Sequence, residues 1–240
     1  MENIVEIDHL SKAFGKQVVL QDVSVRFAKG LIHGVVGRNG SGKTVLFKCI
    51  LGLMPFTQGE IRVRSLRVGQ DIDVPKDVGM LIEAPGFLPN YSGYGNLRIL
   101  ARISHKANKA QIIQAIESVG LEPKSRKWVL KYSMGMRQRL GIAQAIMEDP
   151  DLLILDEPTR GIDVGAKKEI YLLINQLKAR GKGILMISSE MPEMPPSAPV
   201  EETQVVSRQR SPYEAFEIAL LRYVVRYGER ILYDYVDEET

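Results

Sequence analysis

The sequence of 240 residues contains 45% hydrophobic and 25% charged residues, a composition that is typical of globular proteins and excludes collagen-like, low-complexity and disulfide-scaffold chains. Lysine and arginine (32) exceed aspartate and glutamate (29) by too little to indicate nucleic acid or an anionic membrane surface as a partner. The single cysteine, the acidic start and the lack of a long apolar stretch predict a cytoplasmic protein that reaches a membrane only through a separate spanning partner.

Strand-like segments are spread over the first 190 residues. Period-two alternation predicts antiparallel strands with one solvated face, forming a side sheet, at residues 4–14, 18–27 and 61–68. Short, nearly continuous apolar runs predict parallel strands covered on both faces at residues 31–37, 78–82, 151–156 and 183–188.

Helical patterns lie between these strands, at residues 44–53, 96–105, 109–119, 136–147 and 164–179. This alternation predicts an α/β fold with a mainly parallel sheet, an antiparallel side sheet and a helical insertion at about residues 86–148.

The composition changes near residue 190. Residues 1–190 hold 27 basic and 19 acidic residues, whereas residues 191–240 hold 5 and 10. We therefore expect one domain over 1–190, a proline-rich linker over 191–212 and a tail over 213–240. Apolar residues on one face predict a helix in that tail, ending near Gly228; they are Phe216, Ala219, Leu220, Tyr223, Val224 and Tyr227.

A glycine-rich loop follows the first apolar run. Residues 37–44, GRNGSGKT, fit the pattern G-x-x-x-x-G-K-[ST] between a predicted strand and a predicted helix. Such a loop curls its backbone N–H groups toward phosphates, and the helix adds its positive end. Lys43 is expected to reach the β and γ phosphates, and Thr44 to bind Mg²⁺. The candidate nucleotide-binding residues here are Gly37, Asn39, Gly40, Ser41, Gly42, Lys43 and Thr44.

Two carboxylates end the apolar run at 152–157. Asp156 is placed to hold the Mg²⁺ shell, and Glu157 to polarise a water that attacks the γ phosphate. Alone, the pair would favour a buried strand that merely ends in acidic loop residues. The phosphate loop in the same chain favours the catalytic interpretation.

The string YSMGMRQR, residues 132–139, resembles the L-S-G-G-Q signature of ABC transporter ATP-binding subunits, and with the phosphate loop it identifies the chain as similar to that family. Ser133 and Gly135 match, whereas Tyr132, Met134 and Met136 depart from it. Ser133 can offer its hydroxyl and Gly135 its N–H to a phosphate, although a plain helix cap explains Ser133 as well.

The resemblance implies roles for three further residues. Phe14 stands where the family stacks an aromatic ring on adenine, although an isolated phenylalanine on a strand also fits the core. Glu83 stands where the family has a glutamine that senses Mg²⁺, and it adds negative charge there. Asp163 matches the aspartate that crosses the dimer interface, and it can also cap a helix.

Glu190 stands where the family has a histidine. This is a departure with a chemical consequence, since a carboxylate near the γ phosphate is repelled or must be protonated. Residues 1–157 look like export or peptide-immunity subunits, and residues 157–194 look like the second half of sugar-import ATPases. Residues 195–240 are foreign to the family, so the C-terminal part is expected to be atypical or incomplete. The tail is faintly similar to a region of bacterial DNA primases, but it also fits a docking element or a junction of unrelated coding segments.

The resemblance implies an ATPase with a P-loop NTPase core, with ATP and Mg²⁺ as cofactors, that acts as a homodimer or paired subunit on the inner face of the membrane through a transmembrane permease. The catalytic residues would be Lys43, Glu157 and Glu190, the metal-binding residues Thr44, Asp156 and Glu83. No nucleic acid is expected as a partner. Two alternatives stay open: a nucleotide-binding regulatory protein that does not hydrolyse ATP, and a chimeric chain with impaired activity.

Overall fold

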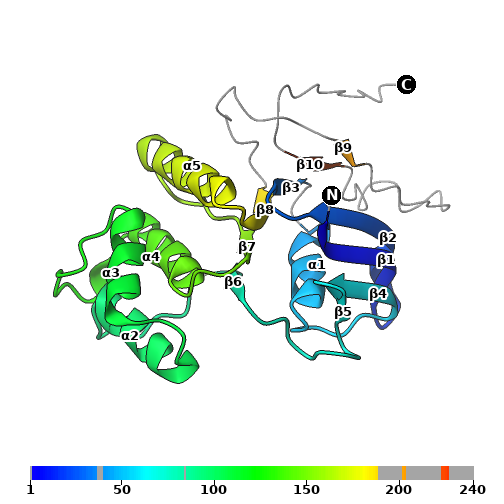
Figure 1. Ribbon diagram of the computed structural model, residues 1–240, viewed down its shortest axis with the longest axis horizontal. Coiled ribbons are helices and arrows are strands. Elements are labelled where there is room, and N and C mark those ends of the chain that lie inside the picture. Colours follow the sequence, from blue (N-terminus) through cyan, green and yellow to red (C-terminus); the bar gives the residue numbers. More distant parts are fainter. Residues whose placement is uncertain (1, 37–39, 84, 189–201, 204–222, 227–240) are drawn as a thin grey trace.

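The computed structural model describes residues 2–36, 40–83, 85–188, 202–203 and 223–226. Over these residues the chain forms a four-stranded antiparallel sheet, a six-stranded sheet and a group of helices set apart from the antiparallel sheet (Figure 1). This architecture confirms the predicted α/β fold with an antiparallel side sheet.

The antiparallel sheet has the order β2-β1-β4-β5. Its strands are β1 (Asn3–Phe14), β2 (Gln17–Ala28), β4 (Gln58–Val63) and β5 (Leu66–Arg67). The single strand predicted over 61–68 is wrong, because Arg64 and Ser65 both adopt positive φ and turn the chain between β4 and β5. A turn of this kind closes a hairpin with the right twist.

The core of the larger sheet is parallel, as predicted, in the order β6-β7-β8-β3. Its strands are β3 (Ile32–Val36), β6 (Val78–Leu81), β7 (Leu152–Asp156) and β8 (Gly183–Ser188). Because these strands are parallel, their carboxyl ends share one edge of the sheet, which is where ligands bind in open α/β folds.

Each of the five helices predicted within residues 1–190 is present within a few residues of its expected bounds. The helices are α1 (Lys43–Ile50), α2 (Gly93–Ser104), α3 (Lys109–Ser118), α4 (Met134–Ile146) and α5 (Val164–Ala179), with a short 3₁₀ turn, η1 (Val129–Lys131). Side chains cap most of them: Ser92 caps α2, and Asn108 forms a capping box with Gln111 on α3. Among the described residues, no helix has the length and apolar character needed to cross a bilayer.

Strand β7 joins two hydrophobic cores, because its side chains alternate between the faces of the sheet. Leu152 and Ile154 pack with α1 and the antiparallel sheet. Leu153 and Leu155 pack with the helices α2 to α5. All five residues of β7 are buried, as expected of a strand that is covered on both faces.

Two short strands lie beyond residue 190. Strand β10 (Tyr223–Arg226) pairs antiparallel with β3, and β9 (Glu202–Thr203) pairs with β10. The helix predicted across Tyr223 and Val224 is therefore wrong there, because the open edge of β3 offers hydrogen bonds that override helical periodicity. The two strands extend the sheet, and β9 interrupts the predicted linker. The other residues of that linker and tail lie outside the described residues.

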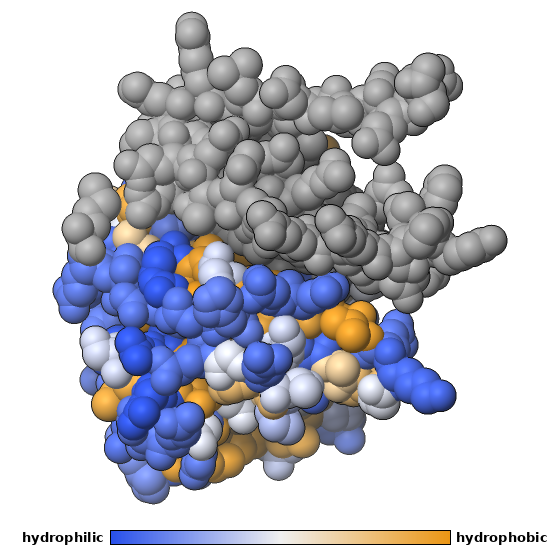
Figure 2. Space-filling view, turned by 90° about the vertical axis from the view of Figure 1, so that its right-hand side faces the viewer, coloured by the Kyte–Doolittle hydropathy of each residue, from blue (hydrophilic) through white to orange (hydrophobic). Residues whose placement is uncertain are grey.

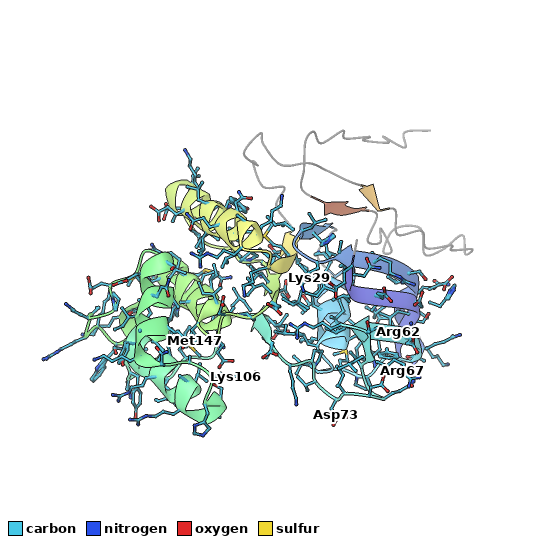
Figure 3. The ribbon with its side chains drawn as sticks, viewed as in Figure 1. Lys29, Arg62, Arg67, Asp73, Lys106 and Met147 are labelled. Carbon is cyan, nitrogen blue, oxygen red and sulfur yellow. The ribbon has the colours of Figure 1, made fainter. Side chains whose placement is uncertain are left out.

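The outer surface beside the antiparallel sheet is mostly hydrophilic, with hydrophobic residues scattered over it (Figure 2). Two arginines of this sheet, Arg62 and Arg67, are labelled in Figure 3. Each is paired locally: Arg62 contacts Glu60 at 2.6 Å, and Arg67 forms a two-pronged pair with Asp71. Hydrogen bonds from Arg67 lower the pKa of Asp71 to about 2. These cations are therefore engaged with neighbouring carboxylates.

Candidate functional site

A cavity of about 670 Å³ opens where the parallel strands end. Its lining comes from β2, from the loop before α1 and the first turn of α1, from the loop after β6, from α4, and from the end of β7 with the loop after it. The lining residues are Val19, Gly40, Gly42, Lys43, Thr44, Val45, Glu83, Met134, Gln138, Asp156, Glu157 and Arg160. Segments far apart in the sequence thus meet at one site.

The glycine-rich loop turns into α1 at Gly42, which has φ 88° and makes no side-chain cap. A Cβ atom here would lie 3.0 Å from both Val19 and Leu20, so only glycine fits. Nearby, the buried hydroxyl of Ser41 has no hydrogen-bond partner among the described residues. An uncapped helix start with an unsatisfied hydroxyl is suited to an external anion.

Thr44 and Asp156 meet in the wall of the cavity. The Thr44 hydroxyl donates to Asp156 Oδ2 at 2.7 Å, although 112 positions separate the two residues. Asp156 is 5% exposed, and burial raises the pKa of its carboxyl, partly offset by the Thr44 hydroxyl and Lys43.

Lys43 is 6% exposed and lies near the carboxylates of Asp156 and Glu157. Burial lowers the pKa of its ammonium group, whereas the charges of Glu157 and Asp156 act in the opposite direction. The site thus holds a desolvated cation next to two carboxylates, an arrangement that is typical of functional sites.

The oxygen atoms of Thr44 and Asp156 suit Mg²⁺ as ligands. A threonine hydroxyl and one carboxylate are hard ligands, and Mg²⁺ usually binds one or two carboxylates while keeping waters and substrate phosphates. The described residues contain no cluster of three or more histidine, cysteine, aspartate or glutamate side chains that would hold a metal by themselves. The donor set therefore fits a metal that arrives with a phosphate ligand.

Glu157 follows β7 directly and has φ 50°, an uncommon value for a residue with a side chain. Two contacts hold its backbone: its N–H donates to the carbonyl of Ile187 at 3.1 Å, and its carbonyl accepts from Gln138 Nε2 at 2.8 Å. The backbone is fixed while the side chain lines the cavity.

Glu83 lines the same cavity and pairs with Lys48 of α1 at 2.5 Å. Four residues implied by the resemblance are not among the lining residues. Phe14 is 47% exposed, with the Lys12 ammonium 4.6 Å from its ring centre. Ser133 and Asp163 cap α4 and α5, and Gly135 lies against Gly161 and Ile162.

Gly37, Asn39 and Glu190 lie outside the described residues. Conversely, the structure adds lining residues to which the sequence analysis gave no role: Val19, Val45 and Arg160 lie outside the motifs, and Met134 and Gln138 lie within the string 132–139. Gln138 carries a sequence signal, since it is the one polar residue on the buried face of α4, whose other buried residues are Leu140, Gly141, Ile142, Ala143 and Ala145. Arg160 has none, because a basic residue after a strand is usually exposed to solvent.

Relatives with similar sequences cover most of the chain. A family model described as ABC transporter matches residues 20–160. The uncharacterized ABC transporter ATP-binding protein YybJ of Bacillus subtilis (strain 168) is 42% identical over 77% of this chain and 85% of YybJ. The bacitracin transport ATP-binding protein BcrA of Enterococcus faecalis is 40% identical over 80% of this chain. The matched part is 62% of BcrA, so this chain spans less than two thirds of that relative.

Solved structures with similar folds also cover most of the chain. One is an ATP-binding subunit of an ABC transporter, with 27% identity, a TM-score of 0.68 and coverage of 78% of this chain and 79% of that one. Another is a bacterial ABC transporter cassette solved as a dimer, with a TM-score of 0.69, 19% identity and coverage of 78% and 88%. The second supports the likeness of fold alone.

Proposed function

Because the chain belongs to the ABC transporter family of ATP-binding proteins, we propose that it binds and hydrolyses MgATP as a dimer and thereby drives a separate membrane permease. The observation that carries this proposal is the meeting of Lys43, Thr44, Asp156 and Glu157 around one cavity at the ends of parallel strands. These are the groups that phosphoryl transfer needs for binding phosphate, holding metal and orienting water.

Phosphate binding is assigned to the start of α1. The backbone of Gly40, Ser41 and Gly42 offers N–H groups, Lys43 offers a desolvated ammonium, and Gly37 and Asn39 complete the motif in sequence. Mg²⁺, held by Thr44 and Asp156, would neutralise charge that develops on the transferred phosphoryl group. Glu157 orients the attacking water, which displaces ADP from the γ phosphorus.

A second copy is needed to complete each site. Each motif occurs once in the chain, and Ser133 and Gly135 are not among the residues that line its own cavity. We propose that they reach the γ phosphate of the partner's nucleotide, and that Asp163 lies at the same interface. The dimeric cassette among the similar structures is consistent with this arrangement.

A permease is proposed as the transport partner because BcrA and the lantibiotic transport protein SrtF of Streptococcus pyogenes are named as transport ATP-binding proteins. An apolar groove of about 590 Å³ between β6 and α2 offers a docking place next to the Glu83 loop. It is lined by exposed Leu53, Met80 and Leu88. This partner would place the protein on the inner face of the membrane.

A nucleotide-binding protein that does not hydrolyse ATP is the second candidate. Glu190 favours it, because a carboxylate in place of histidine would repel the γ phosphate. Glu190→His tests it directly: we expect turnover to rise about tenfold or more if this residue limits hydrolysis. Unchanged turnover in Glu190→His would contradict the hypothesis that Glu190 limits hydrolysis.

The test of the main proposal is calorimetric binding of MgATP to the purified chain, together with steady-state phosphate release and sedimentation with and without nucleotide. We expect MgATP to bind, phosphate to be released at a measurable rate, and dimers to form when ATP is present. AMP serves as the control ligand, because it lacks the β and γ phosphates that the loop holds. Absence of MgATP binding by folded protein would overturn the proposal, and binding without turnover would select the second candidate.

A further inference from the structure

Lys48 lies outside every motif, yet it makes one of the closest ion pairs near the cavity. It is in the last turn of α1, and its Nζ is 2.5 Å from Glu83 Oε1. The side chain of Lys48 is 27% exposed and that of Glu83 is 63% exposed. The pair thus connects the helix behind the phosphate loop to the loop that follows β6.

Glu83 adds a third carboxylate to the lining of the cavity. It lines the same cavity as Asp156 and Glu157, so three carboxylates face a volume that must accept a polyphosphate. The cations of that lining are Lys43 and Arg160. An uncompensated third carboxylate would therefore oppose nucleotide binding.

Two further observations connect the pair to the site. Among the smaller influences on the pKa of Asp156, Glu83 raises it and Lys48 lowers it, so both charges are within electrostatic reach of that carboxyl. In addition, Glu83 has φ 59°, a backbone conformation that is costly for a residue with a side chain. Conformations of this kind persist where the surroundings fix them, and the ion pair supplies such a restraint.

We propose that Lys48 is a positioning residue for MgATP: it fixes the Glu83 carboxylate in the lining of the cavity and cancels its charge, which allows a glutamate to stand there. This inference rests on the proposed function. Lys48 is not among the lining residues of the cavity, so it acts through Glu83 and not by contact with the phosphates.

The test is a double-mutant cycle on Lys48 and Glu83 in which the affinity of each variant for MgATP is measured. The affinity for ATP in EDTA is measured as well. Lys48→Met in the parent leaves Glu83 uncompensated, and we expect roughly fivefold weaker MgATP binding, the upper range for an exposed pair. In the Glu83→Gln background, Lys48→Met should have no effect. Lys48→Arg keeps the charge and should bind like the parent. Thermal unfolding of every variant checks that it is folded.

The outcomes separate this inference from the proposed function. An equal loss from Lys48→Met in both backgrounds, or no loss in either, would overturn the role of the pair while parent binding stays intact. If the folded parent fails to bind MgATP, both the proposed function and this inference are overturned. If Lys48→Met alone unfolds the protein, Lys48→Gln compared in the two backgrounds decides the question in the same way.

Discussion

Two helix starts in this protein differ in what satisfies their backbone N–H groups. Helix α1 begins at Gly42 without a side-chain cap and faces the cavity beside Thr44 and Asp156. Helix α4 begins after Ser133, whose hydroxyl accepts from the N–H of Met136 at 3.2 Å. The start of α1 has no side-chain cap and lies beside Thr44 and Asp156 of the same chain. The start of α4 is capped by the side chain of Ser133.

This difference indicates how the chemistry is divided. The first N–H groups of a helix have no acceptor within that helix, and at α1 no side-chain cap supplies one, which suits a phosphate ligand. At α4 the serine satisfies one of them in the single chain, and in the proposed dimer the N-terminal end of α4 would face the nucleotide of a second copy. Substitutions at α1 should therefore affect binding by one chain, and substitutions at α4 should affect assembly.

The largest effect is expected at Glu157. Glu157→Gln should lower steady-state turnover by about 1,000-fold, because the group that orients water is lost, while MgATP binding persists. Phosphate release and calorimetry measure the two quantities. Glu117→Gln on the exposed face of α3 is the control and should behave like the parent. Turnover that survives in Glu157→Gln would remove this residue from the chemistry.

Lys43→Ala should weaken MgATP binding by about 100-fold, because charge-assisted hydrogen bonds to the phosphates are lost. The substitution also leaves Asp156 and Glu157 without their buried counter-charge. Calorimetry measures the affinity, and Lys109→Ala at the exposed start of α3 is the matched control. Similar affinities for the parent and Lys43→Ala would contradict the assignment of α1 as the phosphate site.

Ser133→Asp separates the two helix starts. Aspartate keeps the cap of α4 but brings a negative charge to the proposed γ phosphate contact, so turnover and ATP-dependent dimerisation should fall about tenfold. Binding by the single chain should stay unchanged. Ser92→Asp, at the equivalent cap of α2, is the control. Equal behaviour of the two variants in sedimentation and turnover would argue against a contact across the dimer.

Asp156→Asn should have the smallest effect, and it concerns stability. Because burial raises the pKa of Asp156, the folded protein holds this proton more tightly than the unfolded chain, and stability falls as pH rises through the raised pKa. Asparagine removes that cost, so the nucleotide-free variant should melt about 2 to 4 °C higher at alkaline pH. The difference should shrink as pH falls and vanish below the pKa of an aspartate in the unfolded chain, in melts at about pH 3.

The control for that measurement is Asp163→Asn, which keeps the cap of α5 outside the cavity. No rise in its melting temperature is expected. If both variants rise equally, the effect reflects surface charge and not the buried carboxyl.

Much of the fold could be predicted because the parallel strands are apolar throughout and the helices carry clear periodicity. The meeting of Thr44 and Asp156 also follows from sequence, since Thr44 begins the helix after the loop that follows β3, and Asp156 ends the parallel strand β7. The pairing of Lys48 with Glu83 could not be predicted, because it depends on how the loop after β6 passes α1. Strand β10 was missed because an open strand edge outweighs local periodicity.

The alternating side chains of β7 also determine how the protein unfolds. Each face of β7 belongs to a different hydrophobic core. If one core loses its packing, one face of β7 is exposed to water, and the strand no longer supports the other core. We therefore expect a single cooperative melting transition for the two cores, and excision of the helical insertion should unfold the phosphate loop as well.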